Sequence, residues 1–501
     1  MSFIRKRIKN GQIYLEEVET IRIDGKVYQK FIRHLGKEVS GKKIITTDTE
    51  SLRIDDVKVY GPLLILNQAA NDLNLKNIFK KYYDEIISLV FAHCLEPKSI
   101  NKIEDWFSRS DLNALLELSN LTETKIYNTL DFLSSIDIDC TQKEIYNEAK
   151  KKLNLLGGGV IYDVTNTHMY SQKCPLAKIG KDKRGVRNSK VIQIGLGVTK
   201  EEGFPVFHKI FSGNIHDSKT LNSLIDNFKK MDFSKGIVVF DRGITSEENM
   251  IELKNIGWST LCGLASNSRL KKMLENIKKE TLCVFKNRVC LKSTVFYVYS
   301  DDYKIGAVEG KIFICFDEKK AKDKRDERFR QIEISKNSYS NLTKKIKIKS
   351  SFLWPNGTIK KNLLFEKERF DGYSFIFSTN KKMKKEDAIR MYFTDKDLVE
   401  KSFRTIKGVT GLRPIRHWLL ERVKAHVMIC YLSYVLLSYL NIKLKKKEIG
   451  VLTALDELDS AYKIYLRDTK RGFSISKIVC LTKKQEDILK CINKKLINLE
   501  L

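Results

Sequence analysis

The sequence predicts an α/β protein with a mixed central sheet, and three observations predict this class. Two apolar, β-branched runs, GGGVIYD and KGIVVFD, end in Asp163 and Asp241 and have the pattern of buried central strands. Helical patterns follow, and one of them, KDLVEKSFRTIKG, carries Glu400. At 501 residues the chain is longer than one hydrophobic core usually fills, so we expect roughly two to four domains.

The first 150 residues predict a region of α+β type. Residues 1–60 alternate short β-type runs with Gly turns, which is typical of a small hairpin-based unit. Residues 61–150 turn helical, and residues 121–124 have the pattern of an N-cap that leads into an amphipathic helix. A helix-turn-helix reader of a DNA major groove fits this pattern, and so does a plain helical bundle. The excess of basic residues favours a DNA-binding region.

Residues 155–265 predict the first part of a catalytic core. Strand patterns lie at 159–163, 169–174, 191–199, 204–211, 236–241 and 259–265, and helix patterns lie at 217–231 and 245–256. Hairpin-like strands precede the first helix, and the strand that ends in the second Asp follows it. This is the order of an RNase H-like sheet, in which the first and fourth strands lie side by side. Asp163 and Asp241, 78 positions apart (241 minus 163), would then be neighbours in space.

The second half of the chain predicts three further segments. Residues 266–368 alternate apolar and polar positions between Gly and Asn turns, which predicts a β-rich insertion subdomain interrupted by an exposed, charged helix, KKAKDKRDERFRQIEISK. The core resumes over 369–445, and 446–501 has the pattern of a Lys-rich helical tail. The apolar run 427–442 is shorter than the roughly 20 residues of a membrane span and contains Ser, Tyr and Asn, so a core helix is expected.

Charge and cysteine usage indicate the partner and the compartment. Lys and Arg number 92 against 62 Asp and Glu, and a surplus of +30 attracts a polyanion such as nucleic acid. The ten cysteines are scattered singly, without CxxC or zinc-ligand spacing, as in a reducing cytosol. The N-terminus has no apolar core of signal-peptide type. We expect a cytoplasmic protein without a membrane partner.

Three carboxylates are the candidate catalytic groups. Two strand-end Asp residues and Glu400 would form an open oxygen site for a pair of Mg²⁺ ions about 3.5–4 Å apart, the arrangement that cleaves and transfers phosphodiesters. Asp163 could instead form a turn, and Asp241 could cap a helix or pair with its neighbour Arg242. On a helix, Glu400 shares a face with Arg404 and Lys407, although surface pairs of this kind are worth only about 0.3–0.5 kcal/mol.

Six motifs in order resemble a known family. They are IRHLG, YDVTNTHMYS, FSGNIHDSKTL, VVFDRG, FDGYSFIFSTN and EKSFRTIKGVTGLRPIRHW. Together they resemble the DDE-type transposases of bacterial insertion sequences, in the group with a β-rich insertion between the second Asp and the Glu. The resemblance covers most of the chain. It implies two Mg²⁺ ions, for which Mn²⁺ may substitute, double-stranded DNA with terminal inverted repeats and a target as partner, a homodimer in a paired-end complex, and a bacterial, nucleoid-associated location.

That group has a signature of Tyr, two residues, Arg, three residues, Glu, six residues and Lys. Glu400 and Lys407 keep its spacing, whereas Lys396 stands at the Arg place and Phe393 at the Tyr place, with Tyr392 beside it. The resemblance implies that Asp163, Asp241 and Glu400 are the catalytic metal ligands. It implies that Lys407 and Lys396 contact DNA, and Arg404 joins them through its place on the same helix face.

We therefore expect a transposase that binds the ends of its own element and cuts and rejoins them by two-metal phosphoryl transfer. Two alternatives stay open. One is an RNase H-like nuclease that only hydrolyses DNA, and the other is a catalytically silent, transposase-derived DNA-binding protein.

Overall fold

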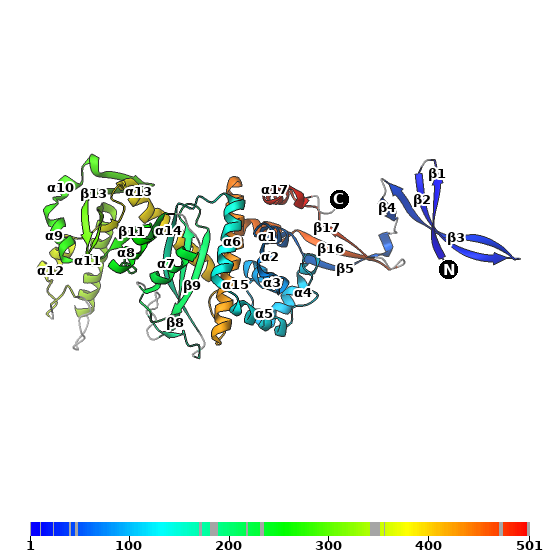
Figure 1. Ribbon diagram of the computed structural model, residues 1–501, viewed down its shortest axis with the longest axis horizontal. Helices are drawn as coiled ribbons and strands as arrows, with labels where there is room; N and C mark the ends of the chain where they lie inside the picture. The colour runs from blue at the N-terminus through cyan, green and yellow to red at the C-terminus, as the bar shows by residue number, and fades with distance from the viewer. Residues whose placement is uncertain are drawn as a thin grey trace. The chain divides into compact units, whose positions relative to one another are not determined.

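The computed structural model describes residues 2–10, 12–23, 25–39, 42–45, 49–169, 173–180, 189–216, 219–230, 235–340, 351–354, 356–469 and 474–497 (Figure 1). The chain divides into two compact units. Unit 1 comprises residues 1–65, 108–115 and 452–501, and unit 2 comprises residues 66–107 and 116–451. The boundaries thus differ from the consecutive segments that the sequence pattern suggested, because the two chain ends belong to one unit.

Unit 1 is built on two small antiparallel sheets. The first has the order β1 (Ser2–Lys9), β2 (Gln12–Ile23), β3 (Lys26–Val39) and β4 (Lys42–Ile45). The second joins β5 (Leu52–Val59) to β16 (Tyr462–Asp468) and β17 (Ser474–Ile478) from the other end of the chain.

The prediction that 446–501 forms a purely helical tail is therefore wrong. Helices α16 (Val451–Leu458) and α17 (Lys483–Ile492) are present, but β16 and β17 lie between them. The run YKIYLRD contains Tyr, Ile and Leu, residue types that are common in strands, and its Lys and Arg content had concealed it.

Unit 2 begins with helices. Helix α1 (Gly61–Asp72) is followed by α2 (Leu75–Phe79), α3 (Tyr83–Leu95), α4 (Ile100–Arg109), α5 (Glu123–Ser135) and α6 (Ile138–Leu153). The side chain of Thr122 caps α5 by accepting from the amide of Lys125, which confirms the predicted N-cap. Their expected role as a helix-turn-helix reader stays a prediction.

The core of unit 2 is a sheet of ten strands. Five of these strands are β6 (Gly159–His168), β8 (Lys190–Thr199), β9 (Pro205–Ser212), β10 (Ile237–Phe240) and β11 (Ser259–Leu264). They have the order β9-β8-β6-β10-β11, and β10 is parallel to β6 and β11, whereas β8 is antiparallel to both its neighbours. The prediction that the first and fourth core strands lie side by side is confirmed, and the fold is RNase H-like.

One predicted strand of this core is absent from the described residues. Met169 makes only an isolated parallel bridge to Ile415, and residues 173 and 174 have no strand pairing, while 170–172 lie outside the described part. Instead the short strand β7 (Lys178–Ile179) pairs with β8. The helices predicted at 217–231 and 245–256 are α7 (Thr220–Lys230) and α8 (Glu247–Asn255).

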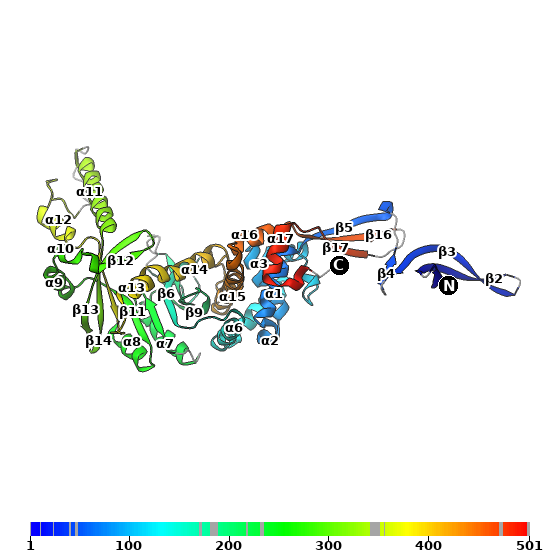
Figure 2. The same ribbon diagram turned by 90° about the horizontal axis from the view of Figure 1, so that it is seen from above.

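The β-rich insertion extends the core sheet. Strands β12 (Arg288–Leu291), β13 (Thr294–Ile305) and β14 (Val308–Asp317) are antiparallel, and β14 pairs with β15 (Tyr373–Ser378), which itself pairs with β11. The insertion also holds the long helix α11 (Glu318–Ser340), seen clearly in Figure 2, and α9 (Ser268–Asn276), α10 (Lys279–Leu282) and α12 (Lys361–Glu368).

The last helices of unit 2 pack on this sheet and on the first helices. Helix α13 (Lys385–Arg390) continues through a π-helical turn, Met391–Asp395, into α14 (Lys396–Gly408), which lies against β6 and β8. Helix α15 (Leu420–Leu444) packs against α3, α5 and α14. Its segment Leu420–Lys447 has the length and apolar composition of a membrane span, but 83% of the apolar window is buried inside the protein, as expected of a core helix.

Candidate active site

The register of β6 and β10 aligns the two aspartates. Ile237 pairs with Gly159, Val238 with Val160 and Val239 with Ile161, in parallel. Continued by two residues beyond this last pair, the same offset of 78 positions would bring Asp241 level with Asp163. Strand β10 ends at Phe240, one residue before the predicted end at Asp241. Strand β6 continues to His168, so Asp163 lies within a strand and not at its end.

Two side chains hold the carboxylate of Asp241. The hydroxyl of Tyr392 donates to Oδ1 at 3.2 Å, and Nζ of Lys396 lies 3.0 Å from Oδ2. Burial opposes ionisation of Asp241, but the Lys396 charge and the hydrogen bonds from Lys396, the Arg242 amide and Tyr392 outweigh it, so the pKa of Asp241 lies below its ordinary value. Burial and the Asp241 charge raise the pKa of Tyr392, which keeps its hydroxyl a donor.

Glu400 joins this group through the same lysine. Nζ of Lys396 lies 3.9 Å from Oε1 of Glu400, one helical turn further along α14. Lys396 is mostly buried, whereas the side chains of Asp241 and Glu400 are 42% and 52% exposed. The structure thus places one ammonium against two of the three predicted carboxylates and leaves both carboxylates open to solvent.

The π-helical turn explains why Tyr392, and not Phe393, reaches Asp241. A π-helical turn adds one residue to the helical repeat, which shifts the side chains before it relative to those after it. Phe393 instead stacks on Phe296, with ring centroids 4.7 Å apart. Gly263 of β11 makes room for the tyrosine, because a Cβ there would lie 2.1 Å from the Tyr392 oxygen. The sequence pattern alone had assigned the tyrosine place to Phe393.

The other predicted cations lie further along α14. Nζ of Lys407 contacts Oγ1 of Thr165, which stands two positions after Asp163 and therefore on the same face of β6. The side chain of Arg404 is exposed. Helix α14 therefore runs along the sheet from Asp241, at its N-terminal end, to the Asp163 face of β6, at its C-terminal end.

Asp241 and Glu400 line a cavity of about 820 Å³, which we call the Asp241 cavity. Three cations of α11, Lys320, Lys324 and Arg328, line it too. They are spaced four residues apart and so share a helix face. Burial and the charges of Lys324 and Arg242 lower the pKa of Lys320. This stripe was missed from the sequence, where the segment predicted only an exposed, charged helix, although the spacing was visible.

The donor set of the cavity suits a hard divalent cation, since carboxylate oxygens are the preferred ligands of Mg²⁺. In the part of the chain that the structure describes, however, no three His, Cys, Asp or Glu side chains are grouped closely enough to hold a metal ion. Asp241 and Glu400 both turn to Lys396, and the sheet register brings Asp163 to the adjacent strand. The residues fit a metal site in kind, and the three carboxylates are not drawn together.

A family model described as "Transposase DDE domain" matches residues 156–436, more than half of the chain. The chain belongs to this family. Among solved structures it is similar to a piggyBac transposase in a synaptic complex with hairpin DNA, with 10% identity, a TM-score of 0.41 and 80% coverage of each chain. No curated protein matches the sequence. The chain is thus a DDE transposase by family, and the matched range begins before β6 and ends within α15.

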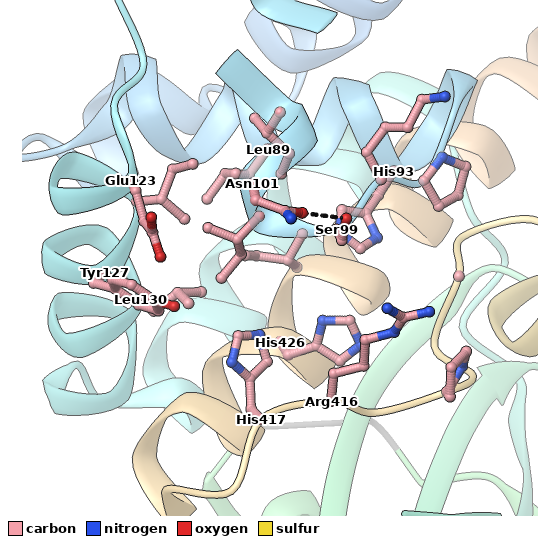
Figure 3. Close-up of a pocket in the computed structure, with 18 of the residues that line it drawn as sticks. Leu89, His93, Ser99, Asn101, Glu123, Tyr127, Leu130, Arg416, His417 and His426 are labelled. Carbon is pink, nitrogen blue, oxygen red and sulfur yellow. Dashed lines mark hydrogen bonds between the residues drawn. The ribbon is translucent and has the colours of Figure 1, made fainter. Parts of the chain in front are cut away.

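A second cavity of the transposase, about 480 Å³ in volume, lies among α3, α5, α15 and the loop before α15 (Figure 3). His93, His417 and His426 turn toward one another at its edge, with ring centroids 5.5 Å apart in each adjacent pair. His93 Nδ1 lies 2.7 Å from the carbonyl of Thr410. Burial lowers the pKa of His417 to about 4 and also lowers those of His93 and His426. The lowered pKa values keep these rings neutral near neutral pH.

Proposed function

We propose that the chain binds the ends of an insertion sequence and cuts and rejoins them by two-metal phosphoryl transfer. The observation that supports this proposal is the parallel pairing of β6 with β10, whose offset would bring Asp241 level with Asp163, together with the approach of Lys396 to both Asp241 and Glu400. Asp163 and Asp241 would hold one divalent ion, and Asp163 and Glu400 the other. Bound Mg²⁺ or Mn²⁺ would activate the attacking oxygen and stabilise the leaving oxygen.

The protein groups around the carboxylates have their own parts in this proposal. Tyr392 orients the Asp241 carboxylate through its hydrogen bond. Because Lys396 lies 3.0 Å from Asp241, it would contact a DNA phosphate bound beside Asp241. It would do so as a point charge, without the bidentate fork of an arginine. Lys407 would contact the DNA backbone beside Thr165, and Arg404, exposed on the same helix, would contact it from the solvent side.

The partners follow from charge and from the reaction. A net charge of +30 supports binding to double-stranded DNA, both the terminal repeats and the target. Because two ends must be joined in concert, we propose a homodimer in the paired-end complex. A cytoplasmic, nucleoid-associated bacterial location belongs to the same proposal.

The two rival functions differ in testable ways. A catalytically silent protein is less well supported, because Tyr392 supplies the hydroxyl that the Phe393 place lacks and Lys396 supplies the cation of the arginine place. A nuclease that only hydrolyses DNA would share every side chain of the site. It would differ in yielding cut ends without joined products.

The test is cleavage and joining of a linear DNA that carries the repeats flanking the gene, in Mg²⁺ or Mn²⁺. Asp163→Ala, Asp241→Ala and Glu400→Ala should each abolish cut and joined products. Asp387→Ala is the matched control, since Asp387 is not among the residues that line the Asp241 cavity and pairs with Arg390 at the surface, 3.2 Å away. Binding without cleavage in either metal would favour the silent protein, and cleavage without joining would favour the nuclease.

A further inference from the structure

The β2–β3 hairpin extends beyond the rest of its sheet. Strand β1 pairs with β2 only as far as Glu19, and β4 pairs with β3 only from Gly36 onward. Between these limits the hairpin is a two-stranded ribbon that projects past β1 and β4 (Figures 1 and 2). We call residues 20–23 and 26–29 the ribbon tip. They form four cross-strand pairs and rise roughly 10 Å along the strands.

The two faces of the ribbon tip carry different chemistry. Thr20 pairs with Gln29 and Arg22 with Val27, so these four side chains share one face. All four are exposed. Arg bonds guanine, Gln bonds adenine, Thr bonds either, and apolar side chains contact the thymine methyl group in a major groove. This face therefore combines the side-chain types that read base edges.

The base of the ribbon is held by ion pairs. Arg5 of β1 pairs with Glu16 at 2.7 Å, and Arg33 of β3 pairs with Glu17 at 2.7 Å. Arg5 also donates to Oε1 of Gln29 at 3.0 Å, which fixes the amide so that its NH₂ group is available as a donor. The glutamates neutralise the cations of the base, whereas Arg22 lies beyond them at the tip.

The dimensions of the ribbon suit duplex DNA. A major groove about 12 Å wide and 8.5 Å deep admits a two-stranded β-ribbon, and the tip projects by about that depth. On the opposite face Lys30 pairs with Glu19 in the register at the base of the tip, where an exposed ammonium can reach a flanking phosphate.

We propose that the ribbon tip reads the sequence of duplex DNA through the major groove, with Arg22 and Gln29 as the base-contacting residues. The proposal rests on the proposed function, because it names the element that recognises the transposon end. It assigns base reading to strands, in contrast to the helices of residues 61–150.

The experiment is selection of bound duplexes from a pool with a randomised central segment, using the full chain in EDTA so that no DNA is cut. The wild type should enrich one motif. Arg22→Lys keeps the charge but loses the bidentate fork, so it should keep the salt dependence of binding and lose the preference at one position, by about 5- to 100-fold. Gln29→Ala should relax a neighbouring position.

Lys30→Gln is the matched control on the opposite face. It should leave the motif unchanged, weaken all sequences alike and reduce the salt slope by about one. Thermal melts of the variants establish that the sheet is intact. An unchanged motif in both Arg22→Lys and Gln29→Ala would overturn the proposal, and so would a wild type that binds DNA without enriching any motif. If the wild type enriches a motif but cannot cut DNA in Mg²⁺, the proposed transposase mechanism is wrong, whereas the proposal that the ribbon tip reads DNA sequence still holds.

Discussion

Replacing Lys396 with methionine should strengthen metal binding and weaken DNA binding at once. Its ammonium lies 3.0 Å from Asp241 and 3.9 Å from Glu400, so its positive charge would repel a metal ion bound by these two proposed ligands. Two unit charges about 4 Å apart interact by about 4 kcal/mol at an effective dielectric of 20 and about 1 kcal/mol in water. Since both carboxylates are about half exposed, we use the interaction energy in water. Doubled for the two charges of a divalent ion, it gives a repulsion of about 2 kcal/mol between Lys396 and a bound metal ion.

Mn²⁺ should therefore bind Lys396→Met about five- to thirty-fold more tightly than the wild type in the absence of DNA. The assay is titration of free Mn²⁺ by electron paramagnetic resonance, or calorimetry. Lys401→Met is the matched control, because it removes the same charge from the same helix but pairs only with the exposed Asp397. Equal affinities of Lys396→Met and wild type, or an equal gain in Lys401→Met, would refute the reasoning.

Three further predictions concern single contacts. Tyr392→Phe removes a hydrogen bond to the charged Asp241 and should slow DNA cleavage about ten-fold with DNA binding unchanged; an unaltered rate would contradict a positioning role. Stability should fall as pH drops from 6.5 to about 4, because the unfolded chain protonates His417 while the folded chain does not; His417→Gln should remove at most about 3 kcal/mol of this loss in the free energy of unfolding, measured by urea denaturation at each pH, and a pH dependence equal to that of the wild type would contradict it. Tyr434→Phe removes the buried hydroxyl that lies 2.5 Å from Oγ of Ser402 and 3.3 Å from the carbonyl of Gly203, and it should lower the free energy of unfolding in urea by about 1–2 kcal/mol; an unchanged value would contradict a net stabilising role of these hydrogen bonds.

The core of the fold was predictable because its signals are local. Runs such as IVVF and VIY consist of β-branched and aromatic residues, which favour a buried strand, and the order of strands and helices then indicates which strands are neighbours. The position of Asp241 followed directly. The extent of β6 did not, since the predicted strand ended at 163 and residues 165–168 are polar, although Thr165 and Thr167 are buried in the strand.

The rest depended on long-range pairing or on helix geometry. The partner of β16 is β5, about 400 residues earlier, and no local pattern in a Lys-rich tail indicates it. The π-helical turn that directs Tyr392 toward Asp241 cannot be recognised from the spacing of apolar residues in the sequence. The stripe of Lys320 and Lys324 was visible as a spacing, but only the tertiary fold directs it at Asp241.

The pairing of β14 with β15, and of β15 with β11, bears on how this chain could be shortened or rearranged. An insertion on flexible tethers could be excised to give a minimal nuclease. Here removal of residues 266–368 would remove β14 and leave one edge of β15 without a paired strand. Since most of β15 is buried, this would expose an apolar strand edge that promotes aggregation. For the same reason strands β12–β14 cannot swing as a separate body without breaking backbone hydrogen bonds to β15, so a movement of these strands must bend the sheet that also carries β10, the strand directly before Asp241.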